Sequence, residues 1–315
     1  MSVSIRVFGT MEIVHSDRDV RKIQQLTSRP RRVLLGLLLA HQGRVVSSDR
    51  LAEAMWPTIR PVTPGKSLQV QVHRLRRSLG PEATLQFRPP GYSLFVPDEQ
   101  VDLRQFERLL AQTRAAWQAG NLGEAAARYR QGLALYRGPA FHGLDEVEEL
   151  VFEARRLAEL RVGALADRIT VELALGRHPE LVAELRALVA KYPLQERFRA
   201  QLMTALHRCG RSAEALAVYQ AGEKLARQEL GVGLGEECRA LARAIHVGEG
   251  SLASADSSSS AEPGGANRQD WVIPGCHASS RWPSITFIGR NRHHGDDIGQ
   301  AWYYGASHLD NEYQG

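Results

Sequence analysis

Residues 63–79 read T-P-G-K-S-L-Q-V-Q-V-H-R-L-R-R-S-L, and this pattern predicts a helix with two unlike faces. Thr63 suits the N-cap position, and Pro64 suits the first helical position. At about 100° per residue, one side of the helix is apolar and has the i, i+4, i+7 spacing of a buried stripe. That side carries Leu68, Val72, Leu75 and Leu79.

The opposite side of this helix is basic. Its centre carries Lys66, Val70, His73, Arg74 and Arg77, and its flanks carry Gln69 and Arg76. Such a face suits the DNA major groove, because Arg and Lys can meet phosphates or guanine and Gln can read a base edge. Basic faces also occur on ordinary solvated helices, so the flanking sequence has to decide between the two interpretations.

The sequence before residue 63 predicts a small β-sheet and two more helices. The first helix is apolar on nearly all sides, so we expect it to lie buried at the centre of its domain. The second is expected to begin after Ser48 as its N-cap and to end before Pro57. The expected strands are residues 4–8 and 11–14, with one or two more in 20–26, and the expected helices are residues 31–41 and 49–56.

The sequence after residue 80 predicts a β-hairpin. Residues 84–96 read T-L-Q-F-R-P-P-G-Y-S-L-F-V, which is two strand-like runs joined by the turn R-P-P-G. Strands, three helices and a terminal hairpin follow one another in a winged helix, where the second and third helices form a helix-turn-helix. The third helix is then the recognition helix. The hairpin is the wing, and Arg88 near its tip is placed to meet a phosphate or the minor groove.

Positive charge is concentrated in the same part of the chain. Residues 1–100 contain 15 Lys and Arg against 8 Asp and Glu, whereas all 315 residues together carry a net charge of only +5. A basic N-terminal part joined to a near-neutral remainder indicates a nucleic-acid-binding module with a second domain attached. The sequence shows neither a signal-peptide pattern nor an apolar run long enough for a bilayer, so the expected location is the cytoplasm, in association with the nucleoid.

An internal repeat marks the following segment. Gly120 and Gly210 are each followed at +5, +9 and +12 by Ala, Tyr and Gly, and Gly176 is followed at the same offsets by Leu. Gly176 and Gly210 are 34 residues apart, which is the period of tetratricopeptide repeats. A small residue lets two helices approach closely, and a large residue one turn later fills the groove. This spacing favours paired helices.

Several blocks of the sequence resemble the Streptomyces antibiotic regulatory protein family. R-R-V-L-L-G-L-L-L-A-H at 31–41, S-L-Q-V-Q-V-H-R-L-R-R-S-L-G at 67–80 and R-P-P-G-Y-S-L at 88–94 resemble its DNA-binding domain, which is a winged helix of the PhoB/OmpR type. D-L-R-Q-F-E-R-L at 102–109 and G-R-S-A-E-A-L-A-V-Y-Q at 210–220 resemble its bacterial transcriptional activation domain. The expected domains are residues 1–97 and 100–247.

The resemblance implies a sequence-specific transcriptional activator of an antibiotic gene cluster. It implies binding to direct repeats of double-stranded promoter DNA near the −35 element, by paired protomers that recruit RNA polymerase holoenzyme. Within this interpretation Val70 is placed to touch a thymine methyl, and Arg76 and Arg88 are expected to hold phosphates. The expected DNA-binding residues are Lys66, Gln69, Val70, His73, Arg74, Arg76, Arg77 and Arg88.

Two alternatives stay open. One is a repeat-based scaffold whose basic N-terminal domain docks an acidic protein, and the other is the same architecture acting as a repressor. No enzyme is expected, because the sequence lacks G-x-x-x-x-G-K-[ST], H-E-x-x-H and G-x-S-x-G patterns. We likewise expect no cofactor, no metal site and no membrane partner.

The composition changes after Val247. A Ser- and Gly-rich stretch begins there, and residues 248–315 are expected to form a disordered or irregular extension. The expected fold class is therefore mainly α with a small β component. It consists of an N-terminal winged helix-turn-helix, an all-α tetratricopeptide-like repeat domain and this tail.

Overall fold

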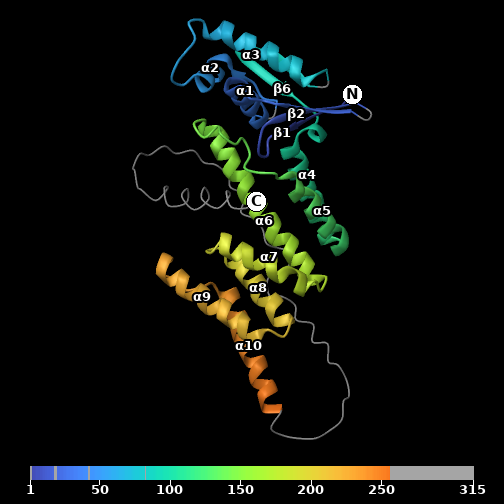
Figure 1. The fold of residues 1–315 in the computed structure, drawn as a ribbon, viewed down its shortest axis with the longest axis vertical. Helices are drawn as coiled ribbons and strands as arrows, with labels where there is room; N and C mark the ends of the chain where they lie inside the picture. The colour runs from blue at the N-terminus through green and yellow to red at the C-terminus, as the bar shows by residue number, and fades with distance from the viewer. Residues whose placement is uncertain (1, 18–19, 42, 82, 256–315) are drawn as a thin grey trace. The chain divides into compact units, whose positions relative to one another are not determined.

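The computed structural model describes residues 2–17, 20–41, 43–81 and 83–255 (Figure 1). The described part is mainly helical with a small β component, as the sequence predicts. The last helix, α10 (Glu236–Ala255), continues into the segment 248–315 that was predicted as an irregular extension. Residues 248–255 are therefore helical, and the rest of that predicted extension lies outside the described residues.

The N-terminal strands form an antiparallel meander. Strands β1 (Ser2–Arg6), β2 (Glu12–Asp17) and β3 (Val20–Gln25) pair in that order, with Ile5 opposite Ile13 and Val14 opposite Ile23. The first strand ends earlier than the predicted residue 8, because the backbone N–H groups of Val7 and Phe8 donate to the carboxylate of Asp102. A side chain far away in sequence thus ends the strand, and a local pattern cannot indicate this.

The three helices α1 (Arg29–Ala40), α2 (Ser48–Met55) and α3 (Pro64–Leu79) form the expected cluster. The central part of α1, from Val33 to Leu39, is buried, and α1 contacts both α2 and α3. The N-cap prediction for α2 was wrong by one residue, because Ser47 is the N-cap and Ser48 is the first helical residue. Ser47 has the extended backbone of a cap, and its hydroxyl accepts a hydrogen bond from the Arg50 N–H at 3.2 Å.

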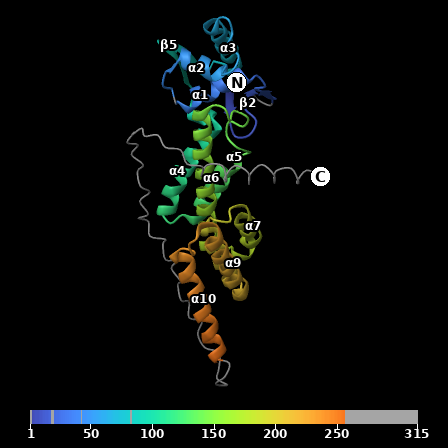
Figure 2. The same cartoon turned by 90° about the vertical axis from the view of Figure 1, so that its left-hand side faces the viewer.

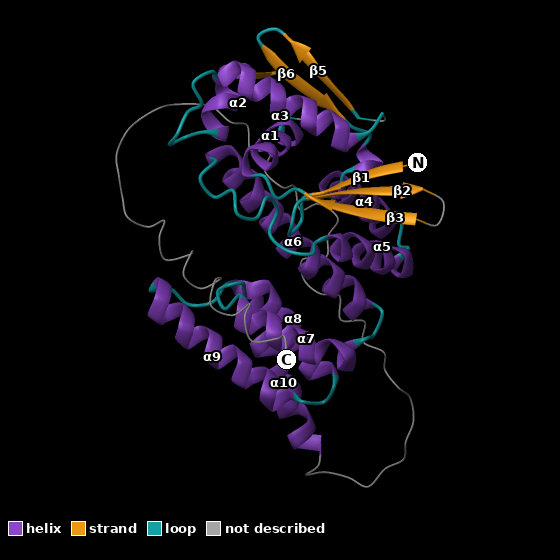
Figure 3. Ribbon diagram, turned by 45° about the horizontal axis from the view of Figure 1, so that its top comes forward, coloured by secondary structure: helices purple, strands orange, loops and turns teal. Residues whose placement is uncertain are grey.

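The wing is a second three-stranded sheet in the order β4-β6-β5, separate from the first sheet (Figure 3). Strands β5 (Thr84–Arg88) and β6 (Gly91–Phe95) form the predicted hairpin. The short strand β4 (Val46–Ser47) also pairs with β6, and the sequence did not indicate it. Gly91 permits this pairing, because a Cβ atom there would overlap the Val46 carbonyl.

The remainder of the described chain is helical. After a 3-10 turn η1 (Asp98–Gln100), the repeat glycines Gly120, Gly176 and Gly210 each join two helices and adopt φ values of 79°, 79° and 73°. The helices are α4 (Asp102–Gln118), α5 (Leu122–Leu135), α6 (Glu148–Ala174), α7 (His178–Lys191), α8 (Glu196–Arg208), α9 (Ser212–Leu230) and α10. Helix α4 packs against α5 (Figure 2) and α8 packs against α9, so these predicted helix pairs are confirmed, whereas α7 packs chiefly against α8.

One hydrophobic core joins the winged helix to the first of these helices. The Phe8 ring lies with its centroid 5.6 Å from that of Phe106 on α4, in an edge-to-face arrangement. Gly36 on α1 contacts α6 directly, since a Cβ atom there would be 2.9 Å from the Leu150 side chain. The segments predicted as separate domains, residues 1–97 and 100–247, therefore both contribute side chains to one hydrophobic core.

Polar contacts also join the winged helix to the helical segment that follows it. Arg50 on α2 donates from Nε to the Glu149 carboxylate of α6 at 3.1 Å. Arg29 of α1 pairs with Glu146, and Arg32 of α1 donates to the carbonyl oxygen of His142 at 3.2 Å. Helices α1 and α2 of the winged helix are thus tied to α6 and to the loop before it by both apolar and charged groups.

Candidate nucleic-acid interface

The apolar stripe of α3 lies where the sequence predicts it. Leu68, Val72, Leu75 and Leu79 are all buried, and α3 contacts α1 and α2. Helix α1, which the sequence predicts to be buried at the centre of the domain, is thus one partner of this stripe. Burying four apolar side chains fixes the rotation of α3 about its own axis and leaves its opposite side to solvent.

The solvent side of α3 carries all the side chains that the sequence placed on its basic and hydrogen-bonding face. Val70 stands among them with 48% of its surface exposed. Within the described part of the chain, the charged groups of Lys66, Arg74 and Arg77 form no ion pair with a carboxylate. Their charge is thus available to an anionic partner. The exposed residues on this face are Lys66, Gln69, Val70, His73, Arg74, Arg76 and Arg77.

Arg76 has a contact that the sequence did not indicate. Its Nε donates a hydrogen bond to the carbonyl oxygen of Leu85 in β5 at 2.9 Å. The contact ties the recognition helix to the wing and involves one of the guanidinium nitrogens. Arg76, which we expected to hold a phosphate, is therefore also part of the link between α3 and the hairpin.

The C-terminal half of α3 is attached to the first sheet as well. Gln24 of β3 donates from Nε2 to the Ser78 hydroxyl at 3.2 Å, and that hydroxyl donates to the Arg74 carbonyl at 3.3 Å. Ser78 is buried in phase with the apolar stripe, where these two hydrogen bonds satisfy its hydroxyl. Sequence reasoning missed Ser78 and Gln24, although a Ser in phase with a buried stripe is a usable signal.

The wing places Arg88 in solvent at the end of β5, beside Gln86. Its neighbour Phe87 is 56% exposed and packs edge-on against Tyr92, with ring centroids 5.2 Å apart. Sequence reasoning did not single out Phe87, which has the same alternation phase as the buried Leu85. Near the tip, however, the hairpin extends past the core that covers Leu85.

The first turn of α3 has no side-chain cap. Thr63 occupies the N-cap position and Pro64 begins the helix, as the sequence predicts, but the Thr63 side chain accepts no cap hydrogen bond. The Ser67 N–H bonds to the Thr63 carbonyl at 3.0 Å and begins the helical ladder. A Cβ atom added at Gly65 would have no packing neighbour within 4 Å, so no other part of the protein packs against this residue.

The described residues contain neither a membrane-spanning helix nor a metal-binding cluster. No helix among them is both long and apolar enough to cross a membrane. In the same part of the chain, no three His, Cys, Asp or Glu side chains lie together in a way that could hold a metal ion.

A winged helix-turn-helix with an exposed basic recognition helix, followed by helical hairpins, defines a DNA-binding transcription regulator. Residues 24–94 match the family model "Transcriptional regulatory protein, C terminal", and residues 101–246 match "Bacterial transcriptional activator domain". The chain belongs to the Streptomyces antibiotic regulatory protein family.

Individual relatives agree with this assignment. The chain is 35% identical over 240 residues to "Regulatory protein DnrI" of Streptomyces peucetius, covering 73% of this chain and 87% of that protein. It is 35% identical over 205 residues to "Regulatory protein AfsR" of Streptomyces griseus, covering 65% of this chain but only 21% of AfsR. A solved structure, "Mycobacterium tuberculosis EmbR in complex with low affinity phosphopeptide", aligns with a TM-score of 0.68 at 25% identity, over 81% of this chain and 71% of that chain.

Proposed function

We propose that this chain activates transcription of an antibiotic gene cluster by binding a specific promoter sequence with α3 in the major groove. The observation that carries the proposal is the exposed basic face of α3, where Lys66, Arg74 and Arg77 form no ion pairs with the described carboxylates. DNA phosphates supply the missing negative charge, and neutralising them releases counterions. Family membership supports the transcriptional outcome.

The residues of this face differ in what they can recognise. Gln69, His73, Arg74 and Arg77 can form hydrogen bonds with base edges, whereas the exposed methyl groups of Val70 fit a thymine methyl. The wing residue Arg88, the remaining guanidinium nitrogens of Arg76 and the Lys66 ammonium then hold phosphates. Phosphate contacts fix the register of the protein on the duplex, and base contacts select the sequence.

Two protomers bind direct repeats near the −35 element on one face of the duplex. The repeats are then separated by whole helical turns, ~10.5 bp each. In this proposal, residues 100–247 form the activation domain, pack the protomers together and contact RNA polymerase holoenzyme. The shared core between that segment and the winged helix supports the idea that bound DNA orients the helical hairpins.

DNA binding is tested by fluorescence anisotropy with a duplex taken from genomic binding-site mapping. We expect a clear preference over a random duplex and a Kd that rises steeply with salt concentration. Arg74→Ala should reduce the preference, and Lys66→Ala should reduce the salt dependence. Lys224→Ala, which removes one exposed positive charge on α9, serves as the matched control and should change neither. Equal affinity for both duplexes would refute sequence-specific binding and favour the scaffold interpretation.

Activation is tested by in vitro transcription with purified RNA polymerase holoenzyme. We expect more transcript from the native promoter and no stimulation when about half a helical turn is inserted between repeats and the −35 element, because protomer and polymerase then face different sides of the duplex. A protein that binds its repeats but lowers transcript yield would be a repressor, and the proposal of activation would then be wrong.

A further inference from the structure

The wing carries an exposed aromatic ring on the side that faces α3. Phe87 is the penultimate residue of β5 and has 56% of its surface exposed. It is in phase with Leu85, which is buried and whose carbonyl accepts the hydrogen bond from Arg76 of α3. Because alternate residues of a strand share a face, the Phe87 ring lies on the α3 side of the hairpin, just beyond the core.

The ring is supported on one side only. Phe87 and Tyr92 are directly opposite each other in the hairpin, and their rings meet edge-on with centroids 5.2 Å apart. Tyr92 is buried and forms a fixed support, whereas much of the Phe87 ring faces solvent. A ring that is already oriented loses little conformational entropy when a partner covers it.

Cationic groups stand on both sides of this ring. Arg76 reaches β5 from α3, so its guanidinium lies beside Leu85. Arg88 follows Phe87 in the chain and points to the other face of the hairpin tip, beside Gln86. The exposed ring thus continues the basic surface of α3 toward the wing.

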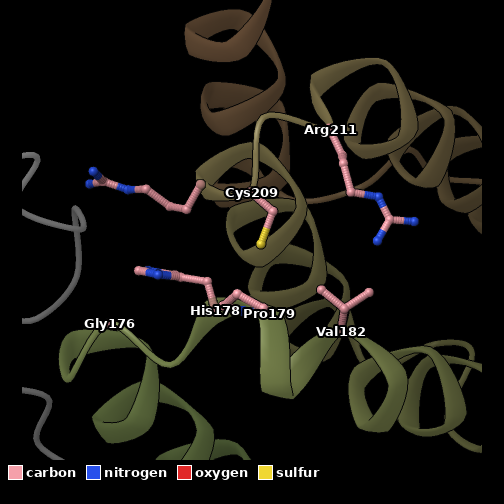
Figure 4. A pocket seen from close by; sticks show the side chains of 7 residues that line it. Gly176, His178, Pro179, Val182, Cys209 and Arg211 are labelled. Atoms are coloured by element: carbon pink, nitrogen blue, oxygen red, sulfur yellow. The ribbon is translucent and has the colours of Figure 1, made fainter.

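Another basic surface of the described chain lacks such a ring. A cavity of about 550 Å³ lies between the α6–α7 turn, which contributes His178, and the α8–α9 turn, which contributes Cys209 and Arg211 (Figure 4). No Phe, Tyr or Trp among the described residues lines it. Positive charge alone suits many anions, whereas a ring between two cationic groups suits a partner that alternates apolar and anionic groups.

The backbone of a DNA duplex has this alternation, because sugars separate its phosphates. One sugar-phosphate strand also separates the major groove from the minor groove. A protein that places α3 in the major groove and the wing in the minor groove therefore covers this strand with the surface between them. On the basis of the function proposed above, we propose that the Phe87 ring packs against a deoxyribose of this strand, where the wing enters the minor groove.

Anisotropy titrations of Phe87→Ala and Phe95→Ala, with the duplex that wild type prefers, test this contact. Phe95 is the matched control, because it is 65% exposed on the opposite face of the same hairpin. Phe87→Ala should raise the Kd about tenfold, the order expected for uncovering part of an aromatic ring, and Phe95→Ala should not change it. The salt dependence of Phe87→Ala should equal that of wild type, because an apolar contact releases no counterions. A misfolded wing would instead lower the salt dependence, through loss of the Arg88 contact.

Hydroxyl-radical footprinting locates the contact, since these radicals attack exposed deoxyribose. Wild type should protect the sugars beside the wing, and Phe87→Ala should lose this protection. Phe87→Tyr keeps the ring and should retain it. Protection of guanine N7 from dimethyl sulfate by α3 in the major groove should be the same in all three proteins.

The contrary outcomes can be told apart. Wild type without sequence preference would refute the proposed function and this contact together. Specific binding by wild type, with Phe87→Ala equal to it in Kd and footprint, would refute the Phe87 contact alone. Normal DNA binding by Phe87→Ala with a lower transcript yield would also overturn it, because the ring would then contact polymerase.

Discussion

The backbone N–H of Val7 donates to the carboxylate of Asp102 at 2.9 Å, across 95 residues of sequence. The Phe8 N–H donates to the same carboxylate at 3.2 Å, and the Arg137 guanidinium lies 3.6 Å away. Asp102 is buried, with 6% of its surface exposed. One acidic side chain at the start of α4 therefore satisfies the backbone of the strand that enters the winged helix.

The first prediction concerns pH. Burial raises the pKa of Asp102 from 3.8 to about 6, although the amide groups and Arg137 act in the opposite direction. The folded state then holds a proton that the unfolded state releases between about pH 4 and 6. The contribution of Asp102 to the free energy of unfolding is fully present below about pH 4 and is lost as the pH rises through about 6.

Urea unfolding of wild type and Asp102→Asn at several pH values checks the direction of this pH dependence. The free energy of unfolding of wild type, relative to that of the variant, should fall as the pH is raised from about 4 to above 6, because only wild type can lose this proton. A difference between the two proteins that stays constant over this range would mean that Asp102 does not titrate there.

The second prediction compares two adjacent arginines on α3. Arg77→Ala should weaken specific DNA binding by about 1–3 kcal/mol, the usual cost of losing a good base contact, and should leave thermal stability unchanged. Arg76→Ala removes the hydrogen bond to Leu85 and should also lower the melting temperature. Gel-shift titrations and thermal melts of both variants separate these roles. Unchanged DNA affinity of Arg77→Ala would remove Arg77 from the interface.

The third prediction compares two glycines in helices. A Cβ atom at Gly222 on α9 would overlap the Arg199 side chain, whose guanidinium is held by the carbonyls of Pro193 and Val218 at 2.8 and 3.2 Å. Gly222→Ala should therefore destabilise the protein by about 1–3 kcal/mol. A Cβ atom added at Gly163 in α6 would meet no atom within 4 Å, so Gly163→Ala should stabilise it by roughly 0.5–1 kcal/mol.

Chemical denaturation of the two alanine variants provides the measurement. The two substitutions add the same methyl group, so opposite signs would show that the space around each glycine decides the effect. If both variants were stabilised, Arg199 would have to move without losing its carbonyl contacts, and the packing argument would fail.

The fourth prediction follows from the shared core. A fragment ending at residue 97 lacks Phe106 and Leu150, so Phe8 and the Gly36 side of α1 become exposed to water. Uncovering one or two large apolar groups costs several kcal/mol, and the fragment should melt at least about 10 °C below the full chain. Thermal melts followed by circular dichroism test this. Equal melting temperatures would show that the winged helix does not need α4 and α6.

The contrast between α3 and Asp102 shows what local sequence can predict. The buried stripe of α3 repeats every turn, so Leu68 to Leu79 could be placed on one face without knowing their partners. The turns at the repeat glycines could be predicted equally well, because a turn between two helices depends on residues that are close in sequence. The hydrogen bonds from Val7 to Asp102 and from Arg76 to Leu85 join different elements, and no periodic pattern encodes them.

Short or ambiguous elements account for the other differences. Strand β4 has only the residues Val46–Ser47, too few for any alternation to appear. At the start of α2, Ser47 and Ser48 are chemically equivalent as caps. The pairing of Ser47 with Gly91 holds its backbone extended, so tertiary structure selects it as the cap.

The uncapped start of α3 has a further consequence. Pro64 has no N–H, so Gly65 and Lys66 provide the amide groups of the first turn that lack a carbonyl partner within the helix. A Cβ atom added at Gly65 would have no packing neighbour within 4 Å, so protein atoms leave space beside this residue. A phosphate oxygen that enters this space would complete the turn. DNA would then supply the hydrogen-bond acceptors that the first turn of α3 lacks. The amide hydrogens of this turn should therefore exchange more slowly in the DNA complex than in the free protein.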